Sequence, residues 1–109
     1  MVWVNQDKCA IVGVGATDYY VRGQSHPRTI NDMVGEAILK ACEDAGLSVR
    51  QIDGFAYYSG AQMGYGDKAD TASLMEMLGI PEITFSAALT SGGGGAAGAV
   101  GLATAAIMN

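Results

Sequence analysis

The chain has few positive charges and few charged residues of either sign. Its 109 residues include 6 Lys and Arg against 11 Asp and Glu, which gives a net charge of −5, and charged residues make up 16% of the sequence. A protein that binds nucleic acid through its phosphates needs a basic surface, so the composition argues against that class. Half of the residues are hydrophobic, and so apolar a chain has enough side chains to fold around a core.

Cysteine is also scarce. Cys9 and Cys42 stand far apart and outside any Cys-x-x-Cys or Cys/His cluster, so we expect no bound metal. Two cysteines do not make a disulfide framework, and we interpret them as reduced core thiols of a cytoplasmic protein. The first eight residues lack the basic and apolar regions of a signal peptide, which favours the same compartment.

No charged residue follows Glu82. The uncharged stretch 83–109 is long enough to raise the question of a transmembrane helix. However, it contains four consecutive glycines, several Ser and Thr and few large aliphatic side chains, which is unlike a membrane span. A helix that is apolar all round is also typical of the buried helix of a large domain. We therefore expect no membrane contact, and we expect the chain to be a piece of a larger protein.

The clearest helix signal lies in residues 29–45. Apolar residues from Ile30 to Ala45 recur at steps of three and four, which forms a single stripe along one helix face. The Thr29 hydroxyl can cap the first turn, with Asp32 three residues on. Gly46 suits the left-handed conformation that commonly ends a helix.

Strands and helices alternate along the whole chain. Residues 8–14 form a short apolar run with β-branched residues at its centre, as expected for a strand covered on both faces. Similar patterns predict strands at 54–59 and 83–89 and helices at 70–78 and 96–108. The order β-α-β-α-β-α predicts an α/β fold with a parallel sheet and right-handed crossovers.

The Gly13-Val14-Gly15 turn follows the first predicted strand. It does not complete a dinucleotide-binding fingerprint, because Asp18 stands where the third glycine is needed and the helix begins well beyond the turn. We interpret these glycines as a tight turn at a strand end.

A second glycine-rich turn, at residues 91–95, precedes the last predicted helix. It lacks the Lys and Ser/Thr of a P-loop, and Ser91 is not a nucleophile elbow because position 89 is Leu89 rather than glycine. A flexible turn between a parallel strand and a helix N-terminus is where α/β folds bind ligands. The alternative is close packing of neighbouring backbones, which glycine permits.

Four stretches together resemble the N-terminal part of thiolase-superfamily enzymes. They read CAIVGVGATDYY, ACEDAGLSVRQIDGFAYYSG, MLGIPEI and, after the glycine-rich turn, GAAGAVGLATAAIMN. The pattern is most similar to the sterol-carrier-protein-x and lipid-transfer branch, often described as acetyl-CoA acetyltransferase-like. The resemblance implies the layered αβαβα fold of that superfamily. Residues 1–109 would then form the first part of its N-terminal half, a partial thiolase-like domain.

The resemblance also implies a site, from which this chain departs. In the family, the cysteine of a Cys-x-x-Gly pattern opens the buried helix and takes the acyl group from coenzyme A. Here the pattern falls on Gly95-Ala96-Ala97-Gly98, so the position of the nucleophile is occupied by Gly95. Neither Cys9 nor Cys42 is suitably placed to replace it. We therefore expect no catalytic residue in the chain, and a substrate-binding set composed of Ser91, Gly92, Gly93, Gly94 and Gly95.

Several functions stay open at this point. The first is that of an enzyme fragment acting on acyl-CoA thioesters in lipid or steroid metabolism, by acyl transfer or by making or breaking a C–C bond. Coenzyme A thioester would be the substrate, with no covalently bound cofactor. The second is a cysteine-less aldolase subunit that cleaves steroid side-chain CoA thioesters together with an OB-fold, zinc-ribbon partner. The others are a non-catalytic acyl-CoA-binding subunit and a small α/β binding module.

The resemblance further implies a homodimer. Residues 83–89, from Ile83 to Leu89, would pair with their counterpart across a two-fold axis. In this chain alone they would be an exposed edge strand that is prone to aggregation. A soluble, monomeric and cooperatively folded 109-residue chain would contradict both this assignment and the interpretation of the chain as a fragment.

Overall fold

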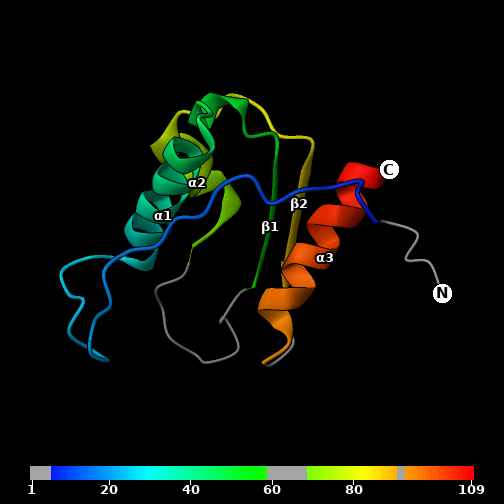
Figure 1. Cartoon of the computed structure of the whole chain (residues 1–109). Coiled ribbons are helices and arrows are strands. Elements are labelled where there is room, and N and C mark those ends of the chain that lie inside the picture. Colours follow the sequence, from blue (N-terminus) through cyan, green and yellow to red (C-terminus); the bar gives the residue numbers. More distant parts are fainter. Residues whose placement is uncertain (1–5, 59–68, 91–92) are drawn as a thin grey trace.

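A computed structural model describes residues 6–58, 69–90 and 93–109. In these ranges the chain forms helix α1, the short 3-10 helix η1, strand β1, helix α2, strand β2 and helix α3 (Figure 1). Their bounds are Ile30–Ala45, Val49–Gln51, Gly54–Tyr58, Thr71–Leu78, Phe85–Leu89 and Gly95–Met108. The three expected helices and the last two expected strands are confirmed, and their ends differ from expectation by one or two residues.

Local interactions set the ends of α1. The Thr29 hydroxyl accepts a hydrogen bond from the Asp32 amide at 3.0 Å, which satisfies one of the amides that a first helical turn leaves unpaired. Gly46 ends the helix at φ 70°, and its N–H bonds the carbonyls of Cys42 and Glu43. A residue with a Cβ atom would be strained in this left-handed conformation, which is why glycine follows the stripe.

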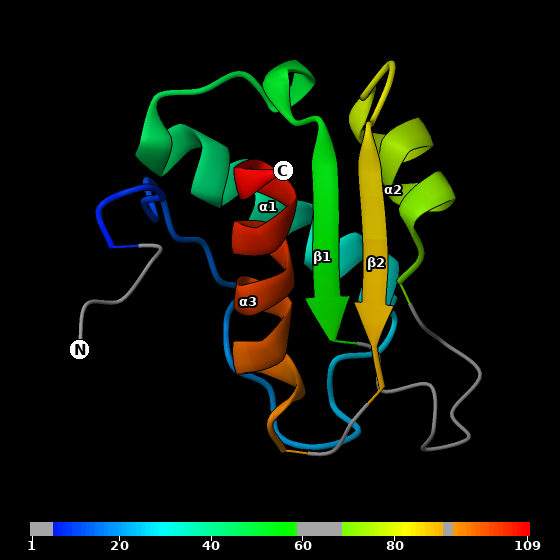
Figure 2. The same cartoon turned by 90° about the vertical axis from the view of Figure 1, so that its right-hand side faces the viewer.

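The two strands are parallel, and they form a two-stranded sheet among the described residues. The register runs from Gly54 opposite Phe85 to Tyr58 opposite Leu89. Helix α3 packs on one face of the sheet, while α1 and α2 lie against each other on the opposite side (Figures 1 and 2). The described part is therefore a small α/β unit with helices on both sides of a parallel sheet.

The expectation of a strand at residues 8–14 is wrong, because this segment forms no strand. It packs against α1 instead. A Cβ atom added to Gly13 would collide with the Ala41 carbonyl and lie 2.8 Å from the Ala45 Cβ. The backbone at the end of the segment and just after it bonds to side chains of the helix: the Val14 amide donates to the Asp44 carboxylate, and the Ala16 carbonyl accepts from Lys40. The observed order is thus α-β-α-β-α, without the leading strand.

Few apolar residues of the described part are buried. They are Cys42, Leu74, Ile80 and Ala99. In contrast, Ile11, Val12, Val14, Val100 and Ile107 are each more than half exposed, although apolar side chains of this size usually lie inside a domain. The described part therefore leaves extensive apolar surface in contact with solvent.

Helix α3 is the helical part of the uncharged stretch 83–109, and it covers 14 residues. That is shorter than the roughly 20 residues that a membrane-spanning helix needs. Among the described residues, no helix combines the length and the apolarity required for a membrane span.

Candidate functional site

The carboxyl ends of β1 and β2 and the N-terminus of α3 lie at the same end of the molecule (Figures 1 and 2). This follows from the order strand, turn, helix, in which α3 runs back along the sheet face that it covers. Parallel α/β folds bind ligands at this edge. Of the five predicted substrate-binding residues, Ser91 and Gly92 lie outside the described residues, whereas Gly93, Gly94 and Gly95 are brought to this edge.

The three described glycines differ in their surroundings. Gly93 and Gly94 are exposed, and a Cβ atom added to either would meet no described residue within 4 Å. Gly95 is buried as the first residue of α3. Close packing, one of the two interpretations of this glycine run, therefore holds for Gly95. Gly93 and Gly94 have no such contact with the described residues.

Gly95 is covered by the ring of Tyr58, the last residue of β1. A Cβ atom added to Gly95 would collide with the ring edge, lying 2.5 Å from Cε2 and 2.9 Å from Cγ. The rest of Tyr58 stays accessible, because the residue is 41% exposed. No local pattern in the sequence predicts this contact, because it joins residues 37 positions apart in the chain.

Helix α3 begins without a side-chain cap. Gly94 stands at the N-cap position, where it offers no side chain, and within the described ranges no side chain bonds to the amides of the first turn. Amides in a first turn lack carbonyl partners within the helix and carry the positive end of the helix dipole. Because no charged side chain follows Glu82, the polarity that α3 brings to this edge comes from its backbone.

Gly98, one turn into α3, provides the second close contact of this region. A Cβ atom added there would lie 2.7 Å from Cδ1 of Leu89, the last residue of β2. Gly95 and Gly98 thus face the last residues of β1 and β2. Small residues at these two helical positions let α3 pack closely on the sheet end, which holds its N-terminus beside the carboxyl ends of the strands.

The other residues considered from the sequence are placed elsewhere. Gly13 and Gly15 pack against α1, so their interpretation as a tight turn at a strand end is wrong, because no strand precedes them. Cys42 is buried on α1 and Cys9 is half-buried, and both are free thiols. Within the described ranges, no cluster of His, Cys, Asp and Glu could hold a metal ion.

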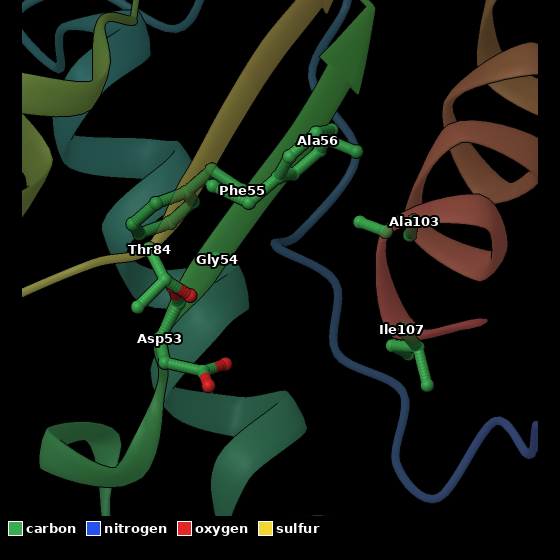
Figure 3. A pocket seen from close by; sticks show the side chains of 9 residues that line it. Asp53, Gly54, Phe55, Ala56, Thr84, Ala103 and Ile107 are labelled. Atoms are coloured by element: carbon green, nitrogen blue, oxygen red, sulfur yellow. The ribbon is translucent and has the colours of Figure 1, made fainter. Parts of the chain in front are cut away.

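Two hollows lie beside β1, and no sequence pattern predicted either of them. One is a groove of about 190 Å³ at the opposite end of the sheet, between the start of β1 and the end of α3, where Ala103 and Ile107 lie opposite Gly54 and Ala56 (Figure 3). The other, of about 380 Å³, is bounded by the segment 11–13, α1, β1 and α3. Both are walled mainly by apolar residues, and small side chains such as Gly54, Ala56 and Ala103 leave the space.

Comparison with known proteins gives a partial match. No protein-family profile matches the chain, and no solved structure matches it significantly. The chain is 33% identical over 93 residues to the 17-hydroxy-3-oxo-4-pregnene-20-carboxyl-CoA lyase of Mycobacterium tuberculosis (strain ATCC 25618 / H37Rv). The aligned part is 85% of this chain and 22% of that enzyme, so the chain spans about a fifth of the enzyme's length. This similarity suggests a distant relationship to that kind of protein.

Proposed function

We propose that the chain supplies part of the acyl-binding site of a thiolase-like enzyme that acts on lipid or steroid CoA thioesters without forming an acyl-cysteine. The observation that carries the proposal is the similarity to a lyase of a steroid-type carboxyl-CoA, together with the glycine at position 95. The resemblance assigns the nucleophile to that position, and glycine has no side chain that could accept an acyl group.

The surroundings of Gly95 suit the acyl end of such a substrate better than its nucleotide end. The coenzyme A moiety carries several phosphates, which proteins usually bind with Lys or Arg. The described residues from 83 to 109 contribute no charged side chain. They contribute uncapped helix amides, beside which lies the aromatic ring of Tyr58, and this combination fits an apolar acyl group and the thioester carbonyl.

Among the open functions, carbon–carbon bond cleavage is the one we favour. In a retro-aldol step, a base takes the proton of the β-hydroxyl group, the bond between the α and β carbons breaks, and its electron pair forms the enolate of the thioester. Amides at a helix N-terminus can stabilise the enolate oxygen. This step needs no covalent acyl carrier, so it is compatible with Gly95, whereas acyl transfer through an enzyme thiol is not.

Two wider parts of the proposal concern assembly. We propose that residues 83–89 pair with a second copy in the complete enzyme, and that an OB-fold, zinc-ribbon protein is a second partner. The first part has some support from the sheet, because β2 has β1 as its single neighbour among the described residues. A non-catalytic acyl-CoA-binding subunit is the second candidate function, favoured by the lack of a nucleophile at position 95.

The proposal is tested by titrating the ¹⁵N-labelled chain with octanoyl-CoA and, separately, with free coenzyme A. We expect octanoyl-CoA to shift the amide signals of Gly93, Gly94 and Gly95 and to shift them more than coenzyme A does, without turnover. Replacing Gly94 by Pro should weaken the effect, because proline removes a backbone N–H from the turn. Gly101→Ala, in the middle of α3, is the matched control. Equal shifts with both ligands, or shifts confined to other regions, would contradict the proposal.

A further inference from the structure

Tyr58 and Gly95 meet because the fold brings the end of β1 to the start of α3. Tyr58 pairs with Leu89 across the sheet, which holds its backbone in place beside the turn that leads to α3. Gly95 is buried in the first turn of that helix. The ring of Tyr58 lies in the space that any side chain at position 95 would need.

A small movement of the Tyr58 ring would not make room for a side chain at position 95. Contacts of 2.5 Å and 2.9 Å from the added Cβ atom reach Cε2 and Cγ, well inside the roughly 3.5–4.0 Å at which carbon atoms pack favourably. Cγ is the first ring atom, so it moves only if the side chain changes its χ1 rotamer or the strand itself shifts. A side chain at position 95 therefore requires that the whole ring leave its site.

We propose that Tyr58 and Gly95 form a coupled pair, in which the ring at position 58 excludes every side chain, a nucleophilic one included, from position 95. This inference rests on the proposed function, which assigns position 95 to the place of the family's nucleophile. It deepens that function by naming Tyr58 as the residue that keeps a side chain out of this place. It implies that the residues at 58 and 95 are energetically coupled, so that a side chain at 95 is tolerated only when the ring at 58 is absent.

A double-mutant cycle tests the coupling by measuring hydrogen exchange of the Ala99 amide, which reports on α3 because Ala99 is a buried residue of that helix. With Tyr58 present, Gly95→Ala should speed this exchange at least about tenfold. In the Tyr58→Ala background, Gly95→Ala should leave it unchanged or slow it, since alanine favours the helix. Tyr58→Phe keeps the ring and should behave like the native residue, whereas Tyr57→Ala leaves the ring at 58 in place and should retain the tenfold effect.

A thiol-labelling experiment then asks whether position 95 becomes usable. Gly95→Cys is made with Tyr58 and with Tyr58→Ala, and labelling by iodoacetamide is followed at each cysteine by peptide mass spectrometry. Cys42, which is 6% exposed, reports unfolding in the same sample. In the Tyr58→Ala background we expect the introduced thiol to be labelled at least about ten times faster than Cys42, and with Tyr58 present we expect the two rates to approach each other.

Equal effects of Gly95→Ala in both backgrounds, or equal labelling ratios with and without the ring, would overturn the inference. Each variant is compared within its own background, so destabilisation by Tyr58→Ala itself cancels from the cycle. Neither measurement contains a CoA thioester. A chain that shows the coupling and binds no octanoyl-CoA would contradict the proposed function alone, and a chain that binds octanoyl-CoA without the coupling would contradict this inference alone.

Discussion

The Asp44 carboxylate accepts a hydrogen bond from the Val14 amide at 3.0 Å, and this bond fastens the N-terminal segment to helix α1. From the sequence, Glu43 and Asp44 are two neighbouring acids on the polar face of that helix. The structure separates their roles. Asp44 supplies the acceptor that a neighbouring strand would otherwise have supplied to the Val14 amide.

Removing the Asp44 carboxylate should free the N-terminal segment. We expect Asp44→Ala to speed hydrogen exchange of the Val14 amide about fivefold, which corresponds to about 1 kcal/mol for a hydrogen bond of this kind. Exchange in the interior of α1 should change little. Glu43→Ala removes the adjacent charge without removing that bond, so it serves as the control. If both variants change the Val14 exchange equally, net charge rather than the hydrogen bond holds the segment.

A methyl group on Gly13 should separate the same segment from α1. The added Cβ would meet backbone atoms of Ala41 and Ala45, which cannot move without disturbing the helix. We expect Gly13→Ala to lower the free energy of unfolding by about 1–3 kcal/mol, measured from the denaturant midpoint by circular dichroism. Gly101→Ala, which meets open space within α3, should instead raise it by about 0.5–1 kcal/mol. Two losses of similar size would show that the tight contact of Gly13 is unimportant.

The ion pairs along α1 predict a pH dependence. Glu36 contacts Arg28, with 2.5 Å between the charged groups, and Lys40 at 2.7 Å. Hydrogen bonds from Lys40 and Arg28 lower the pKa of Glu36 below its usual 4.5. A carboxylate with a lowered pKa stabilises the folded state above its usual pKa, and this contribution is lost as the pH falls through the lowered value.

Glu36→Gln should remove that pH-dependent contribution. We expect the native chain and Glu36→Gln to differ most in thermal midpoint near neutral pH and to converge once the pH falls below the lowered pKa of Glu36. Because the pairs lie at the surface, the difference should be small and should shrink with added salt. Asp32→Asn, which affects another Arg28 contact, gives a comparison on the same helix. A difference that is constant across the pH range would assign the effect to helix propensity instead.

The edge of β2 predicts self-association. Ala88 is exposed on this strand, and an edge strand without charge is a template for pairing with another chain. We expect the 109-residue chain to sediment as dimers or larger species, and Ala88→Lys to shift it toward the monomer. Ala72→Lys adds the same charge to the exposed face of α2 and should have a weaker effect. A monomeric native chain would contradict the assignment of residues 83–89 to an interface.

The sequence by itself determined the helices whose ends are set by capping residues only a few positions away. Thr29 with Asp32, and Gly46 after the last apolar residue, lie within a few positions of the helix ends that they define, so the amide and carbonyl partners can be inferred from spacing alone. The same holds for α2, where the Asp70 carboxylate accepts from the Ser73 amide at 2.9 Å and Gly79 ends the helix at φ 69°.

The tertiary structure decided what depends on distant partners. Residues 8–14 have the composition of a strand, but a strand needs a neighbouring strand to pair with. In this segment the Val14 amide bonds to the Asp44 side chain of α1 instead. Likewise, the sequence shows that position 95 has no nucleophile, because it is glycine. Only the tertiary structure shows that the Tyr58 ring covers this position. Pairing and close packing join residues tens of positions apart, and no local pattern encodes which of the available surfaces will meet.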